Sequence, residues 1–238
     1  MPIARRRSSF PDSPGRRKRA LRSLPYHRDD LRGDLLAAAR RHVVRHGHAG
    51  LSIRLLAQAT GVSPGAPYHH FPDRRSILLA LAIQGFEDMM QATAAATDGK
   101  LRPREQLRRL GLVFIQFADD NPQLIELMYE SELTTPALDP ALLAYQQQGH
   151  GLLVSVTRAA LPRLSEREIE LRVIAFWSAV YGFTSMRRKG VLHPHRPDLL
   201  PTLDIAPALV DRAVQSALDG ARVKVRASRR SRRTSRTT

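Results

Sequence analysis

The stretch GVSPGAPYHHF, at positions 61–71, holds the side chains of this sequence best suited to bind a metal ion or a phosphate. It places Tyr68 and the adjacent histidines His69 and His70 directly after two prolines and two glycines. Imidazoles bind metal ions, and tyrosine and histidine also hydrogen-bond to phosphates. Neighbouring residues of a helix point about 100° apart, so His69 and His70 cannot share one ion without further ligands. No His-x3-His pair supplies such ligands, so we predict no metal here.

The rest of the chain offers little catalytic chemistry. His193 and His195 lie in a proline-rich segment, which favours a surface loop. No cluster of His, Asp and Glu has metal-ligand spacing, and the absence of cysteine excludes disulfides and thiolate sites. We therefore predict no enzyme and no cofactor. A helical, histidine-dependent metalloenzyme remains the least favoured alternative.

The helical register explains how this stretch can be a helix despite its prolines. Ser63 is placed as the N-cap of a helix over 63–70, so Pro64 falls at the first position, where an N–H has no intrahelical partner. Pro67 removes one backbone hydrogen bond. A short helix over 53–59 precedes it, capped by Ser52. Two short helices joined by a glycine-containing turn form a helix-turn-helix, whose second helix can enter the major groove of DNA.

Between its two ends the chain shows helical periodicity almost throughout, which predicts an all-α fold. We expect nine helices, at about 28–46, 53–59, 63–70, 73–96, 104–120, 121–129, 136–160, 165–190 and 207–218.

The charge of the chain is unevenly distributed. Its formal net charge is +16, and most of it lies in two low-complexity ends, 1–25 and 221–238, which we predict to be disordered. Residues 26–75 are also basic, whereas 76–220 are slightly acidic. This asymmetry predicts a polyanionic partner for one end of the molecule. No apolar run approaches the roughly 20 residues of a membrane span, so we predict a cytoplasmic protein without a membrane partner.

The stretch LSIRLLAQATGVSPGAPYHHFPDRRSILLALAIQGF resembles the DNA-binding domain of TetR-type transcriptional regulators, over about 28–89. The resemblance implies an all-helical homodimer that dimerises through its last two helices. It also implies three N-terminal helices on DNA (26–75) and a larger domain (76–220) that binds a small effector. FADDNPQLIELMY and Phe176–Gly182 resemble the sensor domains of this family that carry a Trp, His and Gly signature, with Tyr181 in place of the usual histidine.

By this resemblance, the protein is a bacterial transcriptional repressor that binds a palindromic operator on double-stranded DNA and is located at the nucleoid. The residues expected to contact DNA are Ser52, Arg54, Ser63, Pro64, Gly65, Ala66, Tyr68, His69 and Arg74, while Phe71 is expected in the core. Pro67 departs from the family, which commonly has a leucine there. The proline is expected to weaken the start of the helix and to remove a core side chain.

The apolar side chains of the larger domain supply candidates for an effector pocket, because such pockets are mostly apolar with a few polar groups. They are Phe114, Phe117, Met128, Trp177 and Tyr181. The basic ends leave another reading open, a basic architectural protein that binds nucleic acid mainly through those ends.

Overall fold

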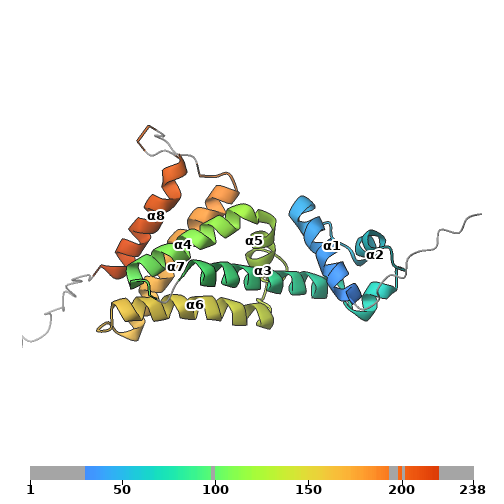
Figure 1. Ribbon diagram of the computed structural model, residues 1–238, viewed down its shortest axis with the longest axis horizontal. Helices are drawn as coiled ribbons and strands as arrows, with labels where there is room; N and C mark the ends of the chain where they lie inside the picture. The colour runs from blue at the N-terminus through green and yellow to red at the C-terminus, as the bar shows by residue number, and fades with distance from the viewer. Residues whose placement is uncertain (1–29, 98–99, 193–197, 200–201, 220–238) are drawn as a thin grey trace, which may run out of the picture.

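The computed structural model describes residues 30–97, 100–192, 198–199 and 202–219, and this part of the chain contains helices and no strand. The molecule is elongated, with α1 (Leu31–His46) and α2 (Ile53–Thr60) at one end. The long helix α3 (Arg74–Ala96) leads from them into a larger helical bundle (Figure 1). The segments 1–25 and 221–238, with His193 and His195, lie outside the described residues.

The larger bundle consists of five helices. They are α4 (Pro103–Asp120), α5 (Pro122–Tyr129), α6 (Pro140–Ala160), α7 (Glu166–Arg188) and α8 (Thr202–Leu218). Helix α4 lies at its centre, in contact with α3, α6, α7 and α8, and α7 packs along α8. None of the described helices is both long enough and apolar enough to cross a membrane.

Local capping fixes the starts of the helices that orient the N-terminal end. The Asp30 carboxylate accepts a hydrogen bond from the Gly33 amide at the start of α1, and the Ser52 hydroxyl accepts one from Leu55 at the start of α2. Asp73 and Ser76 form a reciprocal capping box at the start of α3. Gly61 ends α2 with a left-handed φ of 70°, which glycine adopts without strain.

The expected all-α architecture is confirmed, with eight α-helices and one 3-10 helix, η2 (Ala66–His69), among the described residues. Two predicted starts were wrong. Helix α6 begins at Pro140 rather than at 136, because Asp139 caps it by accepting from the Ala141 amide. Helix α8 begins at Thr202 and carries Pro207 inside it, so this proline does not mark the first turn.

Candidate nucleic-acid interface and ligand cavity

The segment that carries Tyr68 and His69 is a 3-10 helix, and the expected α-helix capped by Ser63 is wrong. Its hydrogen bonds join residues three apart, from Ala66 to the Ser63 carbonyl (3.1 Å) and from Tyr68 to the Gly65 carbonyl (3.2 Å). No side chain caps its start. The reason is Pro67, which has no N–H to donate to Ser63 four residues earlier, so the tighter bonding pattern takes its place.

The two sides of this 3-10 helix differ sharply. Pro67 and Phe71 are buried, and the Arg32 guanidinium lies 5.2 Å from the centre of the Phe71 ring. Tyr68 is 54% exposed, and His69 is exposed beside it. The core position of Phe71 is thus confirmed. The Pro67 ring itself occupies a core position, so the proline changes the helix type but does not leave that position empty.

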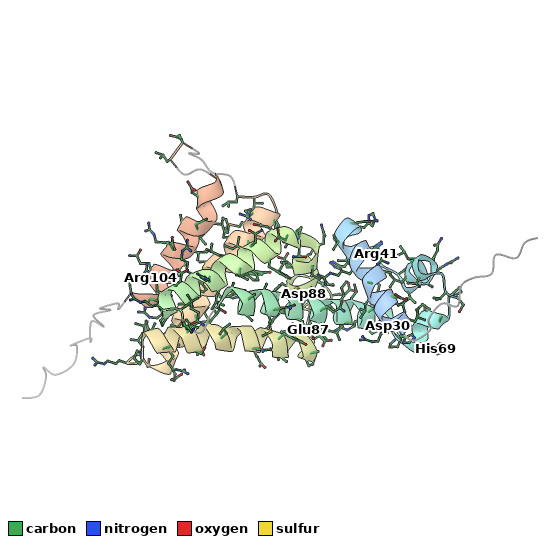
Figure 2. The ribbon with its side chains drawn as sticks, viewed as in Figure 1. Asp30, Arg41, His69, Glu87, Asp88 and Arg104 are labelled. Carbon is green, nitrogen blue, oxygen red and sulfur yellow. The ribbon has the colours of Figure 1, made fainter. Side chains whose placement is uncertain are left out.

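The other expected nucleic-acid contacts lie around the same end of the molecule. Ser52, Arg54, Ser63, Pro64 and Gly65 are exposed, and Ala66 is half-buried. Figure 2 places His69 at the tip of the molecule, far from the helices of the larger bundle. The Ser52 hydroxyl is engaged with the Leu55 amide at 3.2 Å, as a capping side chain.

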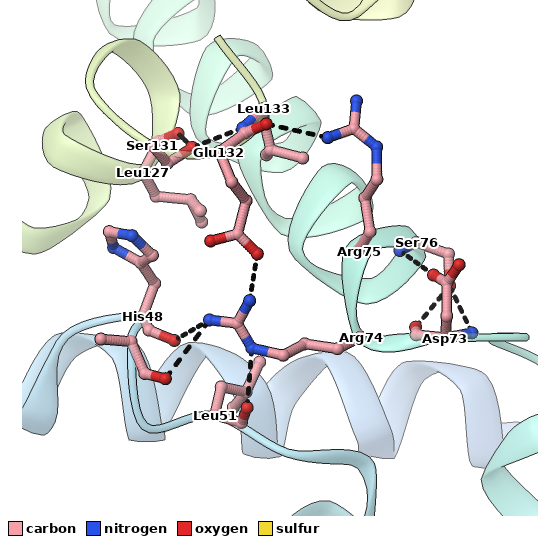
Figure 3. Close-up of polar contacts among 11 residues, drawn as sticks. His48, Leu51, Asp73, Arg74, Arg75, Ser76, Leu127, Ser131, Glu132 and Leu133 are labelled. Atoms are coloured by element: carbon pink, nitrogen blue, oxygen red, sulfur yellow. Dashed lines mark hydrogen bonds and ion pairs between the residues drawn. The ribbon is translucent and has the colours of Figure 1, made fainter. Parts of the chain in front are cut away.

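The Arg74 guanidinium is bonded to other residues of the protein. Its Nε donates to the Leu51 carbonyl (2.8 Å) and its Nη2 donates to the His48 carbonyl (2.7 Å), while Nη1 pairs with the Glu132 carboxylate (Figure 3). Glu132 follows α5, so this one guanidinium joins the loop between α1 and α2 to the larger bundle. Few of its donors are left for an external phosphate.

Arg75 makes a second link between the start of α3 and the segment that joins α5 to α6. Its guanidinium donates to the Glu132 carbonyl (2.9 Å) and to the Asp139 carboxylate (2.7 Å), and Asp139 caps α6. Arg40 of α1 also pairs with Asp88 of α3 at 2.6 Å. Charged contacts therefore tie the N-terminal end to the helices that surround the cavity described next.

A half-open cavity of about 520 Å³ lies between α3, α4, α5, α6 and α7. Of the five residues expected there, Phe114 and Trp177 line it, with their ring centres 4.6 Å apart. The other three do not line this cavity. Phe117 and Met128 are buried in the core, and Tyr181 stands behind the aromatic wall, where its hydroxyl donates to Glu130 at 3.1 Å.

Glu130 is the charged centre behind that wall. Arg188 (2.5 Å) and Lys189 (3.1 Å) surround its carboxylate together with the hydroxyls of Tyr181 and Ser185. Although partial burial by itself raises the pKa of Glu130, the hydrogen bonds from Arg188 and Lys189 outweigh it and lower that pKa to about 2. Burial and the nearby Glu130 charge raise the pKa of Tyr181 to about 12. This network fixes the end of α5 against α7.

Several lining residues were missed from the sequence. Phe86, Tyr129 and Tyr145 complete the aromatic wall, and α6 contributes a continuous run from Tyr145 to Val154 apart from Gln148. This run includes Gly149 and Gly151, which lie two residues apart in the middle of the helix. Such glycines cost about 1 kcal/mol each relative to alanine, so their presence there was a usable signal.

Among the described residues no group of three or more His, Asp or Glu side chains could hold a metal ion. His69 and His70 have no such partners around them.

Two family models together match most of the chain. Residues 35–81 match the family of bacterial regulatory proteins called tetR, and residues 107–228 match the tetracyclin repressor-like C-terminal domain. Over 51 residues the chain is 47% identical to the HTH-type transcriptional repressor AcnR of Corynebacterium glutamicum, which covers 21% of this chain and 27% of the relative. Over 95 residues it is 35% identical to the HTH-type transcriptional regulator CymR of Pseudomonas putida, which covers 40% and 44%. The matches therefore span less than half of these curated relatives.

Solved structures extend the likeness to the larger bundle. A protein of unknown function from Rhodococcus sp. RHA1 is similar with a TM-score of 0.67 at 26% identity, over 83% of this chain and 98% of that one. A TetR-like transcriptional regulator from the same organism has a TM-score of 0.57 at 21% identity, over 80% and 96%. The latter likeness concerns the fold alone.

Proposed function

The chain belongs to the TetR family of bacterial regulatory proteins, and from this we propose that it is a transcriptional repressor that leaves its operator when a small molecule binds. One observation carries the DNA-binding part of the proposal. Tyr68 and His69 are exposed at the tip of the molecule, on a short helix whose other side is buried through Pro67 and Phe71. A rigid, exposed pair of hydrogen-bonding side chains at a basic end suits a phosphate backbone.

We assign the following roles around this pair. Tyr68 and His69 contact the DNA backbone, and Arg54 and Ser52 contact phosphates from the start of α2. Ser63, Pro64, Gly65 and Ala66 lie where base edges pass, because their small side chains let the DNA approach closely. Arg74 takes a different role from the one expected. Since its guanidinium bonds to His48, Leu51 and Glu132, it holds the helix-turn-helix in place instead of contacting a phosphate.

Substitutions of Arg74 and of the exposed Arg54 in α2 should have opposite effects on stability and on DNA binding. Arg74→Met should lower the melting temperature and leave the salt dependence of operator binding unchanged, because it breaks internal bonds. Arg54→Met should leave the melting temperature unchanged and reduce the slope of log K against log salt by about 0.9 per lost contact. Thermal unfolding and binding titrations at several salt concentrations measure both quantities. A reduced slope for Arg74→Met would assign it to a phosphate after all.

The far end of the molecule supports a homodimer. On α7, Leu171 (47% exposed) and Ile174 (53% exposed) lie on a face that no described helix covers, next to α8. We propose that α7 and α8 pack against the same helices of a second copy, through a twofold axis. Two DNA-binding ends related in this way require a palindromic operator with half-sites one or more helical turns apart. Mapping nuclease protection on the DNA upstream of the gene tests this, and uniform protection without paired half-sites contradicts it.

The links at the start of α3 suggest how ligand binding reaches the DNA. Phe86 and Met89 of α3 line the cavity, and Arg74 and Arg75 of the same helix hold the α5–α6 segment and the loop between α1 and α2. A ligand that shifts α3 therefore moves the helix-turn-helix. If the ligand binds more tightly to a dimer conformation that does not fit DNA, it lowers the population of the conformation whose two DNA-binding ends match successive major grooves.

The alternative functions have specific tests. A basic architectural protein would lose most of its nucleic-acid affinity when the segments 1–25 and 221–238 are deleted. A histidine-dependent metalloenzyme would purify with stoichiometric metal. We assign no enzymatic activity and no cofactor, and place the protein in the bacterial cytoplasm at the nucleoid.

A further inference from the structure

Among the residues that the structure describes, no Lys or Arg lines the cavity. The carboxylate and the imidazole among its lining residues are Glu170 of α7 and His150 of α6. These two bind each other, with 2.8 Å between Glu170 Oε2 and His150 Nε2. Neither the carboxylate nor the imidazole is thus left as a counter-ion for a ligand.

This pairing restricts the charge of the ligand. Moving an isolated charge from water into an apolar cavity is strongly unfavourable unless an opposite charge receives it. An anionic ligand would meet no Lys or Arg in the lining, and a cationic ligand would compete with His150 for the single carboxylate. The lining therefore selects against charged molecules, and most strongly against anions.

The shape of the lining favours a ring. Phe114 and Trp177 meet edge to face at 4.6 Å between ring centres, and Phe86 stacks on Tyr145 at 5.7 Å. Tyr129 lies between these pairs, 5.4 Å from Phe86 and 6.0 Å from Phe114. Aromatic side chains in such arrangements accept a further ring by stacking or edge contact. The volume of about 520 Å³ lies within the range of sites for drug-sized molecules.

Tyr129 also supplies the polar group that orients such a ring. The hydroxyls of Tyr145 and Tyr181 donate to Glu87 and Glu130. The Tyr129 hydroxyl, in contrast, makes no hydrogen bond within the part of the chain that the structure describes, and Tyr129 lines the cavity. Burial raises the pKa of Tyr129 well above its ordinary value, so the hydroxyl stays protonated and remains a donor. A hydroxyl donor on the cavity wall that has no protein partner can bond to an acceptor on the ligand.

We propose that the cavity binds an uncharged aromatic molecule with a hydrogen-bond acceptor, its ring against Phe114 and Trp177 and its acceptor on the Tyr129 hydroxyl. This inference rests on the proposed function, because it takes the cavity as the effector site. It narrows the effector from any small molecule to a neutral aromatic class, and it sets fatty acids, phosphates and other anions aside.

A pair of fluorescent probes tests the charge selection on the full chain. N-phenyl-naphthylamine and anilinonaphthalene sulfonate share a scaffold and differ by the anionic sulfonate. Trp177 is the single tryptophan of the chain and lines the cavity, so energy transfer from it reports a probe bound beside it. We expect the neutral probe to bind at least about tenfold more tightly than the sulfonate in this signal. Equal or tighter binding of the sulfonate overturns the proposal.

Variants locate the effect in the cavity. Leu143 lines the cavity and is 42% exposed, so Leu143→Lys adds a cation at the wall in a position that tolerates it. This variant should strengthen sulfonate binding and weaken binding of the neutral probe, while Leu143→Gln, which is polar but uncharged, should not reverse the preference. Trp177→Phe removes the energy donor and should abolish the signal for both probes. A preference unchanged by Leu143→Lys places the probes elsewhere and contradicts the proposal.

A matched pair of ligands tests the role of Tyr129. Acetylnaphthalene carries an acceptor carbonyl, and ethylnaphthalene does not. The affinity of each ligand is measured by competition with the neutral probe. We expect Tyr129→Phe to weaken the binding of acetylnaphthalene about three- to tenfold and to leave the binding of ethylnaphthalene unchanged. Equal effects on both ligands overturn the assignment. All of these titrations are made without DNA, and operator binding is measured without ligand. A failure of the ligand class is therefore distinguishable from a failure of the proposed repressor function.

Discussion

Replacing Tyr68 and His69 together by alanine should lower the affinity for the operator at least about thirtyfold and leave the melting temperature of the protein unchanged. Each side chain is exposed and makes no hydrogen bond within the described part of the chain, so truncation removes only contacts to DNA. A hydrogen bond to a charged group contributes about 1.5–3 kcal/mol, and two such bonds per protomer account for the size of the loss. Binding titrations on the mapped operator measure it.

The neighbouring His70 provides the matched control for this substitution. It is exposed and has the same side chain as His69, but it follows the end of the 3-10 helix. His70→Ala should change operator affinity less than about threefold, which is the scale of an ordinary surface substitution. Identical binding by the wild type and the Tyr68, His69 double variant would show that this surface is not the DNA contact.

Arg172→Leu should destabilise the larger bundle by about 2–4 kcal/mol, the cost of leaving buried partners of a charged group unpaired. The Arg172 side chain is only 8% exposed. Its Nη1 donates to the carbonyls of Ala217 (2.8 Å) and Asp219 (2.7 Å), at the end of α8, and its Nε donates to Glu168 (2.8 Å). The last carbonyls of a helix have no intrahelical partner, so this arginine replaces the missing donors. Leucine fills similar space but satisfies none of them.

Thermal or denaturant unfolding at fixed protein concentration measures this loss, because a dimer's stability depends on concentration. Arg109 gives the control, since it forms the same Arg–Glu pair within one helix turn, with Glu105 at 3.0 Å, but at the surface. Arg109→Leu should cost less than about 1 kcal/mol. Equal effects of the two substitutions would mean that the bonds from Arg172 to the end of α8 contribute nothing.

The parts of the fold that depend on near neighbours could be predicted from the sequence. Ser52 was predicted as a helix cap, and the predicted helix starts at 73 and 165 coincide with the caps Asp73 and Ser165, because a cap bonds to an amide three residues away. The same local reasoning failed at Ser63. There Pro67 was counted as the loss of one bond, whereas the loss changes the whole segment from an α-helix to a 3-10 helix.

The parts that depend on distant contacts could not be predicted. Arg74 has the appearance of a phosphate contact in sequence, yet its carboxylate partner, Glu132, is 58 residues away. The start of α6 was ambiguous because Pro136 and Pro140 are both acceptable in a first turn. Likewise, Met128 and Phe114 were both candidates for the effector pocket, but only the packing of five helices decides that Phe114 borders the cavity and Met128 does not.

Sequence-specific binding is measured as the affinity of the protein for the DNA upstream of its own gene, compared with unrelated DNA of equal length and base composition. The comparison is made at one salt concentration, with the full chain and with a variant that lacks residues 1–25 and 221–238. We expect both proteins to prefer the upstream DNA at least about a thousandfold, because the residues placed at base edges, Ser63 to Ala66, lie outside the deleted ends. Equal affinity for the two DNAs, or a preference that disappears with the basic ends, would contradict a sequence-specific repressor.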